Sequence, residues 1–90
     1  MRKYIKNRLS IIIPTYNEAN NITGLTTEII DLMKDRDYEI LIVDDGSTDS
    51  TVENIFDHFN DNKNIKVFQR EYDRGLLQSI KFALQSMTGE

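Results

Sequence analysis

An uninterrupted apolar run that stops at two acids constrains this chain more than any other feature. The run from Ile40 to Val43 is followed at once by Asp44 and Asp45, and then by Gly46. An unbroken Ile/Leu/Val run bounded by turn residues is typical of a strand buried on both faces. Ionised groups are costly to bury without partners, so such a strand has no structural need for two carboxylates at its tip. Because ligands bind at the carboxyl ends of strands in open α/β sheets, we interpret this tip as one wall of a ligand site.

The rest of the chain alternates strand and helix patterns. Residues 9–13, 38–43 and 65–69 have strand character, and the third segment alternates more, as expected near a sheet edge. Apolar residues recur at helical spacing in residues 20–34, 50–59 and 76–87. This alternation predicts a Rossmann-like α/β fold, a parallel sheet with right-handed crossovers in the order β-α-β-α-β-α. Pro14 is expected to end the first strand, because proline cannot donate to a sheet ladder.

The sequence also predicts how the first two helices begin and which side chains they bury. Asn20 or Asn21 is expected to cap the first helix, and Ser50 with Glu53 has capping-box spacing at the second. The apolar positions expected to face the sheet are Ile22, Leu25, Ile29, Leu32 and Met33 in the first helix and Val52, Ile55, Phe56 and Phe59 in the second.

Length and composition exclude several classes of protein. The chain has 90 residues, which is one domain or part of one, and its net charge of −4 argues against a nucleic-acid partner. It has no cysteine and one histidine, so neither thiol chemistry nor a histidine-based zinc site is expected. No apolar run approaches the roughly 18 residues of a membrane span. We expect a cytoplasmic protein. In an alternative, the basic lead-in 1–8 lies peripherally on the cytoplasmic face of the membrane through Arg2, Lys3, Lys6 and Arg8.

The last predicted helix is expected to lead into a further strand, because helices of a doubly wound fold connect strands. The sequence given stops at Glu90. We therefore expect residues 9–90 to be the N-terminal portion of a longer domain. A chain of this size buries a limited share of its surface, so we expect modest stability or pairing with a second copy.

Two polar clusters are expected to meet at the carboxyl edge of this sheet. A tyrosine can stack on a planar ring, and carboxylates accept hydrogen bonds from ring N–H groups, amino groups and sugar hydroxyls. Together they would suit a nucleoside, whereas a diphosphate would need a cation or added basic groups. Neither a Gly-x-Gly-x-x-Gly fingerprint nor a P-loop motif is present. The residues concerned are Pro14, Thr15, Tyr16 and Glu18 after the first strand and Val43, Asp44 and Asp45 after the second.

Two motifs then resemble a known family. Ile11-Ile-Ile-Pro-Thr-Tyr-Asn-Glu18, followed by Ile42-Val-Asp-Asp-Gly-Ser-Thr-Asp49, resembles the opening of the family 2 glycosyltransferases, which have the GT-A fold. The resemblance covers about residues 9–90. More loosely, Arg74-Gly-Leu-Leu-Gln-Ser-Ile-Lys-Phe-Ala-Leu84 resembles the branch that transfers a sugar to a polyprenyl phosphate, as dolichol-phosphate mannose synthases do.

The resemblance implies a role for each matching residue. Pro14, Tyr16 and Glu18 match positions around the base and ribose. Val43 and Asp45 match positions that contact the nucleoside, with Asp45 accepting a ring N–H. Asp44 matches the adjacent acid, which is more often a supporting group.

The family's Asp-x-Asp metal motif, acceptor site and catalytic base would lie beyond Glu90, so no catalytic or metal-binding residue is expected within this chain. The complete enzyme is expected to use Mg²⁺ or Mn²⁺, a UDP-sugar or GDP-sugar donor, and a lipid-phosphate or saccharide acceptor.

Plainer readings stand beside these. Asp44 and Asp45 can serve only to shape the Gly46 turn and cap the second helix, and Asp49 is expected to be a cap. The phenylalanines, Phe82 among them, are expected in the core, and His58 on a helix surface. Two other functions also remain open. A receiver-type signalling module clusters aspartates at strand ends, and a non-catalytic nucleotide-binding or assembly module would bind without turnover.

Overall fold

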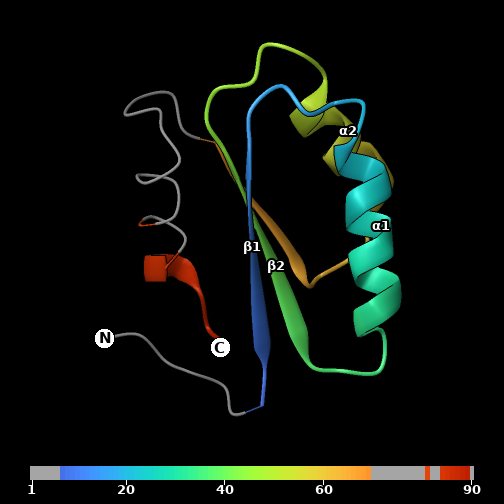
Figure 1. Ribbon diagram of the computed structural model, residues 1–90, viewed down its shortest axis with the longest axis vertical. Helices are drawn as coiled ribbons and strands as arrows, with labels where there is room; N and C mark the ends of the chain where they lie inside the picture. Colours follow the sequence, from blue (N-terminus) through green and yellow to red (C-terminus); the bar gives the residue numbers. More distant parts are fainter. Residues whose placement is uncertain (1–6, 70–80, 82–83, 90) are drawn as a thin grey trace.

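The computed structural model describes residues 7–69, 81 and 84–89. Three parallel strands form a sheet in the order β1-β2-β3, with β1 at Leu9–Thr15, β2 at Tyr38–Asp44 and β3 at Ile65–Gln69. The helices α1 (Ile22–Met33) and α2 (Thr51–Phe59) connect them and lie together on one side of the sheet (Figure 1). The predicted α/β alternation is confirmed over these five elements. Of the predicted third helix, Lys81 and residues 84–86 are helical, Met87 is not helical, and residues 76–80, 82 and 83 lie outside the described residues.

Strand β2 is the centre of the sheet. All seven of its residues are buried, and the side chains from Ile40 to Val43 have no exposed surface. Ile40 and Ile42 form the core with Ile22 of α1 and Ile55 of α2. The expected strand buried on both faces is confirmed.

The first strand does not end at Pro14, as predicted, but continues to Thr15. The Thr15 carbonyl accepts a hydrogen bond from the amide of Asp45 at 3.0 Å, so the backbone of Thr15 faces β2. Backbone groups of successive strand residues point to opposite sides, and the nitrogen of Pro14 therefore faces away from β2. Proline is tolerated there because no bond to β2 is lost.

The buried face of α1 is turned relative to the predicted one. Ile22 and Thr26 are buried, whereas Leu25 is 46% exposed and Leu32 is 75% exposed. The prediction for these two leucines was wrong. The face that meets the sheet uses positions four residues apart, and it includes a threonine that a purely apolar pattern overlooks. Phe56 of α2 was also assigned to the core, and it is 52% exposed.

Neither helix begins with the predicted side-chain cap. Asn21 and Ser50 occupy the N-cap positions, but neither side chain makes a cap hydrogen bond. The predicted capping box of Ser50 and Glu53 is therefore wrong. Asp49 replaces it, because its carboxylate accepts hydrogen bonds from the Thr51 amide at 3.0 Å and from the Thr51 hydroxyl. The expectation that Asp49 acts as a cap fits this geometry.

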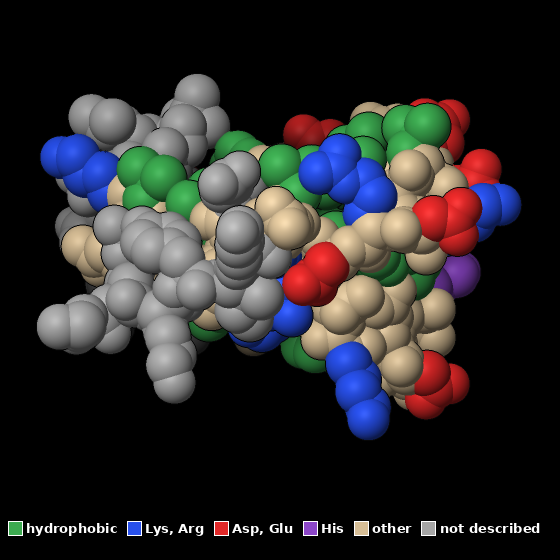
Figure 2. All heavy atoms as spheres, turned by 90° about the horizontal axis from the view of Figure 1, so that it is seen from below, with side chains coloured by type: hydrophobic (Ala, Val, Ile, Leu, Met, Phe, Trp, Pro, Cys, Tyr) green, Lys and Arg blue, Asp and Glu red, His purple; other side chains and the backbone are tan. Residues whose placement is uncertain are grey.

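A buried carboxylate organises the opposite, amino-terminal edge of the sheet. Glu39 is 1% exposed, and it accepts hydrogen bonds from the Ser10 hydroxyl, the Thr88 amide at 2.5 Å and the Gly89 amide at 3.0 Å. Residues 84–89, which bring Thr88 and Gly89 there, lie across the sheet from α1 and α2 (Figure 1). Acidic and basic side chains are interspersed over the described surface seen from this end, with no field of one sign (Figure 2).

Candidate functional site

The loops that follow β1 and β2 start side by side. The parallel register pairs Pro14 with Val43 and Thr15 with Asp44, so the two strands end level. A small open pocket of about 170 Å³ lies at this point, lined by Pro14, Thr15, Tyr16 and Asp45. It is smaller than the roughly 300 Å³ at which complete ligand pockets begin. At this edge, the described residues alone therefore do not enclose a pocket of that size.

Asp44 holds the turn together. Its side chain is 1% exposed. One oxygen, Oδ1, accepts the Thr15 hydroxyl at 2.8 Å and the Ser47 hydroxyl at 2.5 Å, and Oδ2 accepts the Ser47 amide at 2.8 Å. Gly46 makes the turn possible, because its φ of 82° lies in the left-handed region that favours glycine. Asp44 thus has a structural role that needs no ligand.

Asp45 and Tyr16 differ from Asp44 because both line the pocket. Asp45 is 7% exposed and Tyr16 is 44% exposed. The acid is therefore largely buried beside the pocket, whereas Tyr16 is partly exposed. Val43 is fully buried, so its side chain offers no surface at this edge.

Glu18 lies in an adjoining pocket. That pocket is about 230 Å³ and shares Pro14 and Thr15 with the first, but it does not include Tyr16 or Asp45. The Glu18 carbonyl accepts hydrogen bonds from the Asn21 and Ile22 amides, at 3.0 and 2.9 Å, and so opens α1. The structure thus brings Pro14, Tyr16 and Asp45 to one pocket and places Glu18 in the next.

Asn17 joins the two loops. Its φ of 54° is left-handed, which asparagine tolerates better than most residues. Its side-chain Oδ1 accepts hydrogen bonds from the backbone amides of Thr48 at 2.8 Å and Asp49 at 3.3 Å. Its backbone N–H donates to the Ser47 hydroxyl at 2.8 Å. Sequence reasoning gave Asn17 no role. An asparagine inside a turn, facing a second polar loop, was the available signal.

Further hydrogen bonds join the loop after β1 to the start of α2. The Glu18 amide donates to the Thr51 hydroxyl at 2.8 Å, and the Ala19 amide donates to Asp49 at 3.2 Å. Hydrogen bonds, first that of the Thr51 hydroxyl, lower the pKa of Asp49 despite some opposing desolvation. The Asp49 carboxylate is therefore held in its charged form by the start of α2.

The described residues do not form a metal centre. Within residues 7–69, 81 and 84–89, no three His, Cys, Asp or Glu side chains are grouped so that they could hold a metal ion. The carboxylates of Asp44 and Asp49 are occupied by the hydrogen bonds of the two loops. A divalent cation does not fit these residues alone.

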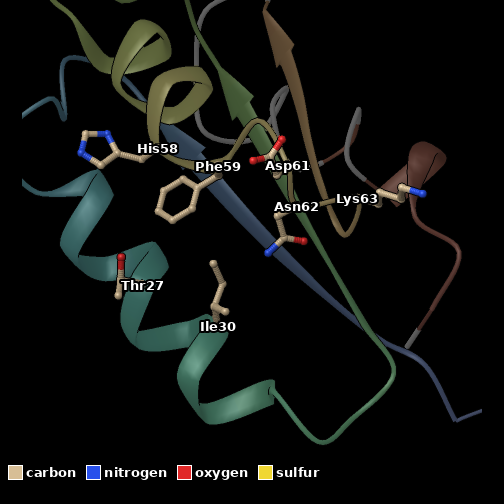
Figure 3. A pocket seen from close by; sticks show the side chains of 7 residues that line it. All are labelled: Thr27, Ile30, His58, Phe59, Asp61, Asn62 and Lys63. Carbon is tan, nitrogen blue, oxygen red and sulfur yellow. The ribbon is translucent and has the colours of Figure 1, made fainter.

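A larger pocket of about 540 Å³ lies away from this edge, between α1 and the end of α2 (Figure 3). Ile30 and Phe59 approach each other across it, whereas the Lys63 side chain extends away (Figure 3). His58 lines it and is exposed, as expected for a helix surface. The pocket contains none of the residues assigned to the nucleoside site, which are Pro14, Tyr16, Glu18, Val43, Asp44 and Asp45.

Comparison with known proteins identifies the class. The sequence model of the family described as glycosyl transferase family 2 matches residues 10–90, and the chain belongs to this family. The fold agrees with that of a mannosyltransferase from Pyrobaculum calidifontis, solved in complex with GDP-mannose and Mn²⁺. That match covers 90% of this chain and 24% of the other, with a TM-score of 0.78 and 27% identity. The expected GT-A-type α/β fold is thereby confirmed.

Two curated relatives are similar to the chain in sequence. A dolichol-phosphate mannosyltransferase from Pyrococcus furiosus is 32% identical over 83 residues, which are 92% of this chain and 23% of the relative. A dolichyl-phosphate β-glucosyltransferase from Saccharomyces cerevisiae is 46% identical over 48 residues, which are 50% of this chain and 14% of the relative. The chain spans about a quarter or less of the length of these relatives. In the part of the chain that the structure describes, no helix has the length and apolar character needed to cross a bilayer.

Proposed function

We propose that this chain forms the nucleoside-binding half of a nucleotide-sugar site in a glycosyltransferase. The observation that supports this most is the pocket shared by Pro14, Tyr16 and Asp45 at the level ends of two parallel strands. Family membership supports a sugar nucleotide as the ligand. In this proposal residues 9–90 form the nucleotide-sugar-binding portion of the transferase domain.

Each residue of the pocket has a distinct role in this proposal. Tyr16 stacks on the base, because an exposed aromatic ring beside an acid suits a planar, N–H-bearing ring. Asp45 accepts a hydrogen bond from a ring N–H, and Pro14 packs against the same ring. Glu18, in the adjoining pocket, accepts from a ribose hydroxyl.

The other two proposed residues act indirectly. Asp44 supports the site by accepting hydrogen bonds from the Thr15 hydroxyl and the Ser47 amide, which hold the end of β1 and the Ser47 turn in place. Val43 fixes the register of β2 against Pro14, since its side chain is fully buried.

The relatives support a proposal for the donor and acceptor classes. A mannosyltransferase with the same fold binds GDP-mannose, and the curated relatives are named for dolichol phosphate. We propose a GDP-sugar or UDP-sugar donor and a lipid-phosphate acceptor. A divalent cation, Mg²⁺ or Mn²⁺, would neutralise the diphosphate, with its ligands supplied from outside the described residues. A peripheral location beside the lipid acceptor fits the same proposal.

A titration of the 90-residue chain followed by amide NMR tests the proposal. UDP, GDP, ADP and CMP are added separately, with and without Mn²⁺. The expected result is shift changes at Tyr16, Glu18 and Asp45 for one base in preference to the others. A folded, well-dispersed chain that responds to none of the four nucleotides contradicts the proposal that these residues form a nucleoside site.

A further inference from the structure

We propose that Asn17 is a positioning residue that sets Tyr16 opposite Asp45 and thereby controls base selectivity. This inference rests on the proposed nucleoside site. It adds a residue that touches neither pocket: Asn17 lines neither the cavity of Tyr16 and Asp45 nor that of Glu18.

The residues on both sides of Tyr16 are held by the end of β2 and the loop after it. On one side, the Thr15 hydroxyl donates to Asp44 at 2.8 Å. On the other, the backbone N–H of Asn17 donates to the Ser47 hydroxyl at 2.8 Å, and that hydroxyl donates to the same Asp44 oxygen at 2.5 Å. The four residues thus form a closed chain of hydrogen bonds in which Tyr16 is the residue between the two anchored ends.

The Asn17 side chain fixes the second loop in return. Its Oδ1 accepts the Thr48 amide at 2.8 Å and the Asp49 amide at 3.3 Å. Two backbone donors on one amide oxygen leave the 47–49 loop little freedom to move relative to β1. Because only Gly46 separates Asp45 from this loop, the same contacts restrain the separation between the acid and the aromatic ring.

The backbone conformation of Asn17 is also needed. At a φ of 54° most side chains are strained, while glycine, asparagine and aspartate are tolerated. Two substitutions therefore separate backbone from side chain. Asn17→Gly keeps the left-handed backbone and removes the acceptor, and Asn17→Asp keeps both the backbone and an acceptor oxygen.

The test measures the Kd of the 90-residue chain for GDP and for UDP. Asn17→Gly is expected to weaken binding of the preferred nucleotide about tenfold, equivalent to roughly one lost hydrogen bond, and to narrow the ratio between the two Kd values. Asn17→Asp is expected to restore the affinity to within about threefold of the unaltered chain. Asn20→Ala, at an exposed asparagine three positions away, is the matched control and should change neither Kd.

Ser47→Ala removes the hydroxyl that accepts the Asn17 backbone N–H and donates to Asp44, a contact that Asn17→Gly leaves intact, so it provides an independent test should Asn17→Gly not fold. It is expected to reduce the selectivity in the same direction. If the unaltered chain binds neither nucleotide, the proposed function fails and the inference fails with it. If the unaltered chain binds one base selectively, and folded Asn17→Gly or Ser47→Ala keeps both the affinity and the selectivity, the positioning role alone is overturned.

Discussion

The hydroxyl of Thr15 donates a hydrogen bond of 2.8 Å to the carboxylate of Asp44, the residue paired with it where β1 and β2 end. Both side chains are buried. This contact ties the end of β1 to the end of β2, and the two loops that carry the proposed site start from these strand ends.

The first prediction concerns this contact. Thr15→Val keeps the shape of the side chain and removes the donor, so a buried carboxylate oxygen loses one of its partners. We expect the free energy of unfolding to fall by about 1–3 kcal/mol, measured by urea denaturation. Thr27→Val, at an exposed position of α1, is the control and should change it by less than about 0.5 kcal/mol. Equal effects at both positions would contradict the structural role of Thr15.

The second prediction concerns pH. Burial raises the pKa of Glu39, but hydrogen bonds from Ser10 and Thr88, together with the charge of Lys66, lower it from 4.5 to about 2. Because the pKa is lower in the folded chain than in the unfolded chain, the ionised carboxylate adds to the free energy of unfolding above pH 4.5. This contribution is lost as the pH falls from 4.5 toward 2. This linked contribution is about 3 kcal/mol at most.

Glu39→Gln should remove this dependence. The variant is expected to be less stable at pH 7 and to lose less stability between pH 5 and pH 2.5 than the unaltered chain, measured by urea denaturation at each pH. Glu28→Gln, on the exposed side of α1, is the control. If Glu39→Gln and the unaltered chain have parallel pH profiles, the buried carboxylate is not the source of the dependence.

The third prediction uses two glycines in different surroundings. A Cβ on Gly89 would lie 2.6 Å from the Arg8 carbonyl oxygen, whereas a Cβ on Gly24 of α1 would meet nothing within 4 Å. Gly89→Ala is expected to destabilise the chain by about 1–3 kcal/mol through this clash with backbone. Gly24→Ala is expected to stabilise it by about 0.5–1 kcal/mol, because alanine is the better helix former. Thermal unfolding of both variants should shift in opposite directions, and a shift in the same direction would count against the described packing of Gly89.

The fourth prediction concerns a buried hydroxyl. Thr26 Oγ1 is buried in α1 and has no hydrogen-bond partner among the described residues. Thr26→Val replaces that hydroxyl with a methyl group of similar size, which removes the cost of burying an unpaired polar atom. We expect an increase of about 1 kcal/mol in the free energy of unfolding by urea. A decrease would show that the hydroxyl has a partner.

The sequence was sufficient to predict the three strands, apart from the end of β1, and the level strand ends at which we propose the site. The apolar run from Ile40 to Val43 predicted a strand covered on both faces. Its parallel pairing with β1 followed from the alternation of strands and helices. Family motifs supplied the residue roles, which remain proposals.

The details that sequence patterns missed depend on tertiary contacts. Successive residues of a helix point about 100° apart, so a small rotation of α1 about its axis decides whether Leu25 or Thr26 faces the sheet. The five apolar positions of this helix did not determine that rotation. Whether Ser50 or Asp49 capped α2 depended on the path of the loop after Gly46. The link from Asn17 to Thr48 spans 31 positions in the chain, so no local rule could have predicted it.

The most direct test of the central claim compares two ligands on the unaltered chain. The Kd of the preferred nucleotide is measured by NMR titration beside that of the same nucleotide methylated on the ring nitrogen that carries the N–H. If Asp45 accepts that N–H at the pocket it shares with Tyr16, methylation should weaken binding at least about tenfold, because the buried carboxylate loses its donor and meets a methyl group instead. Equal affinity for the two nucleotides would contradict the account, because it would show that the base does not lie against Asp45.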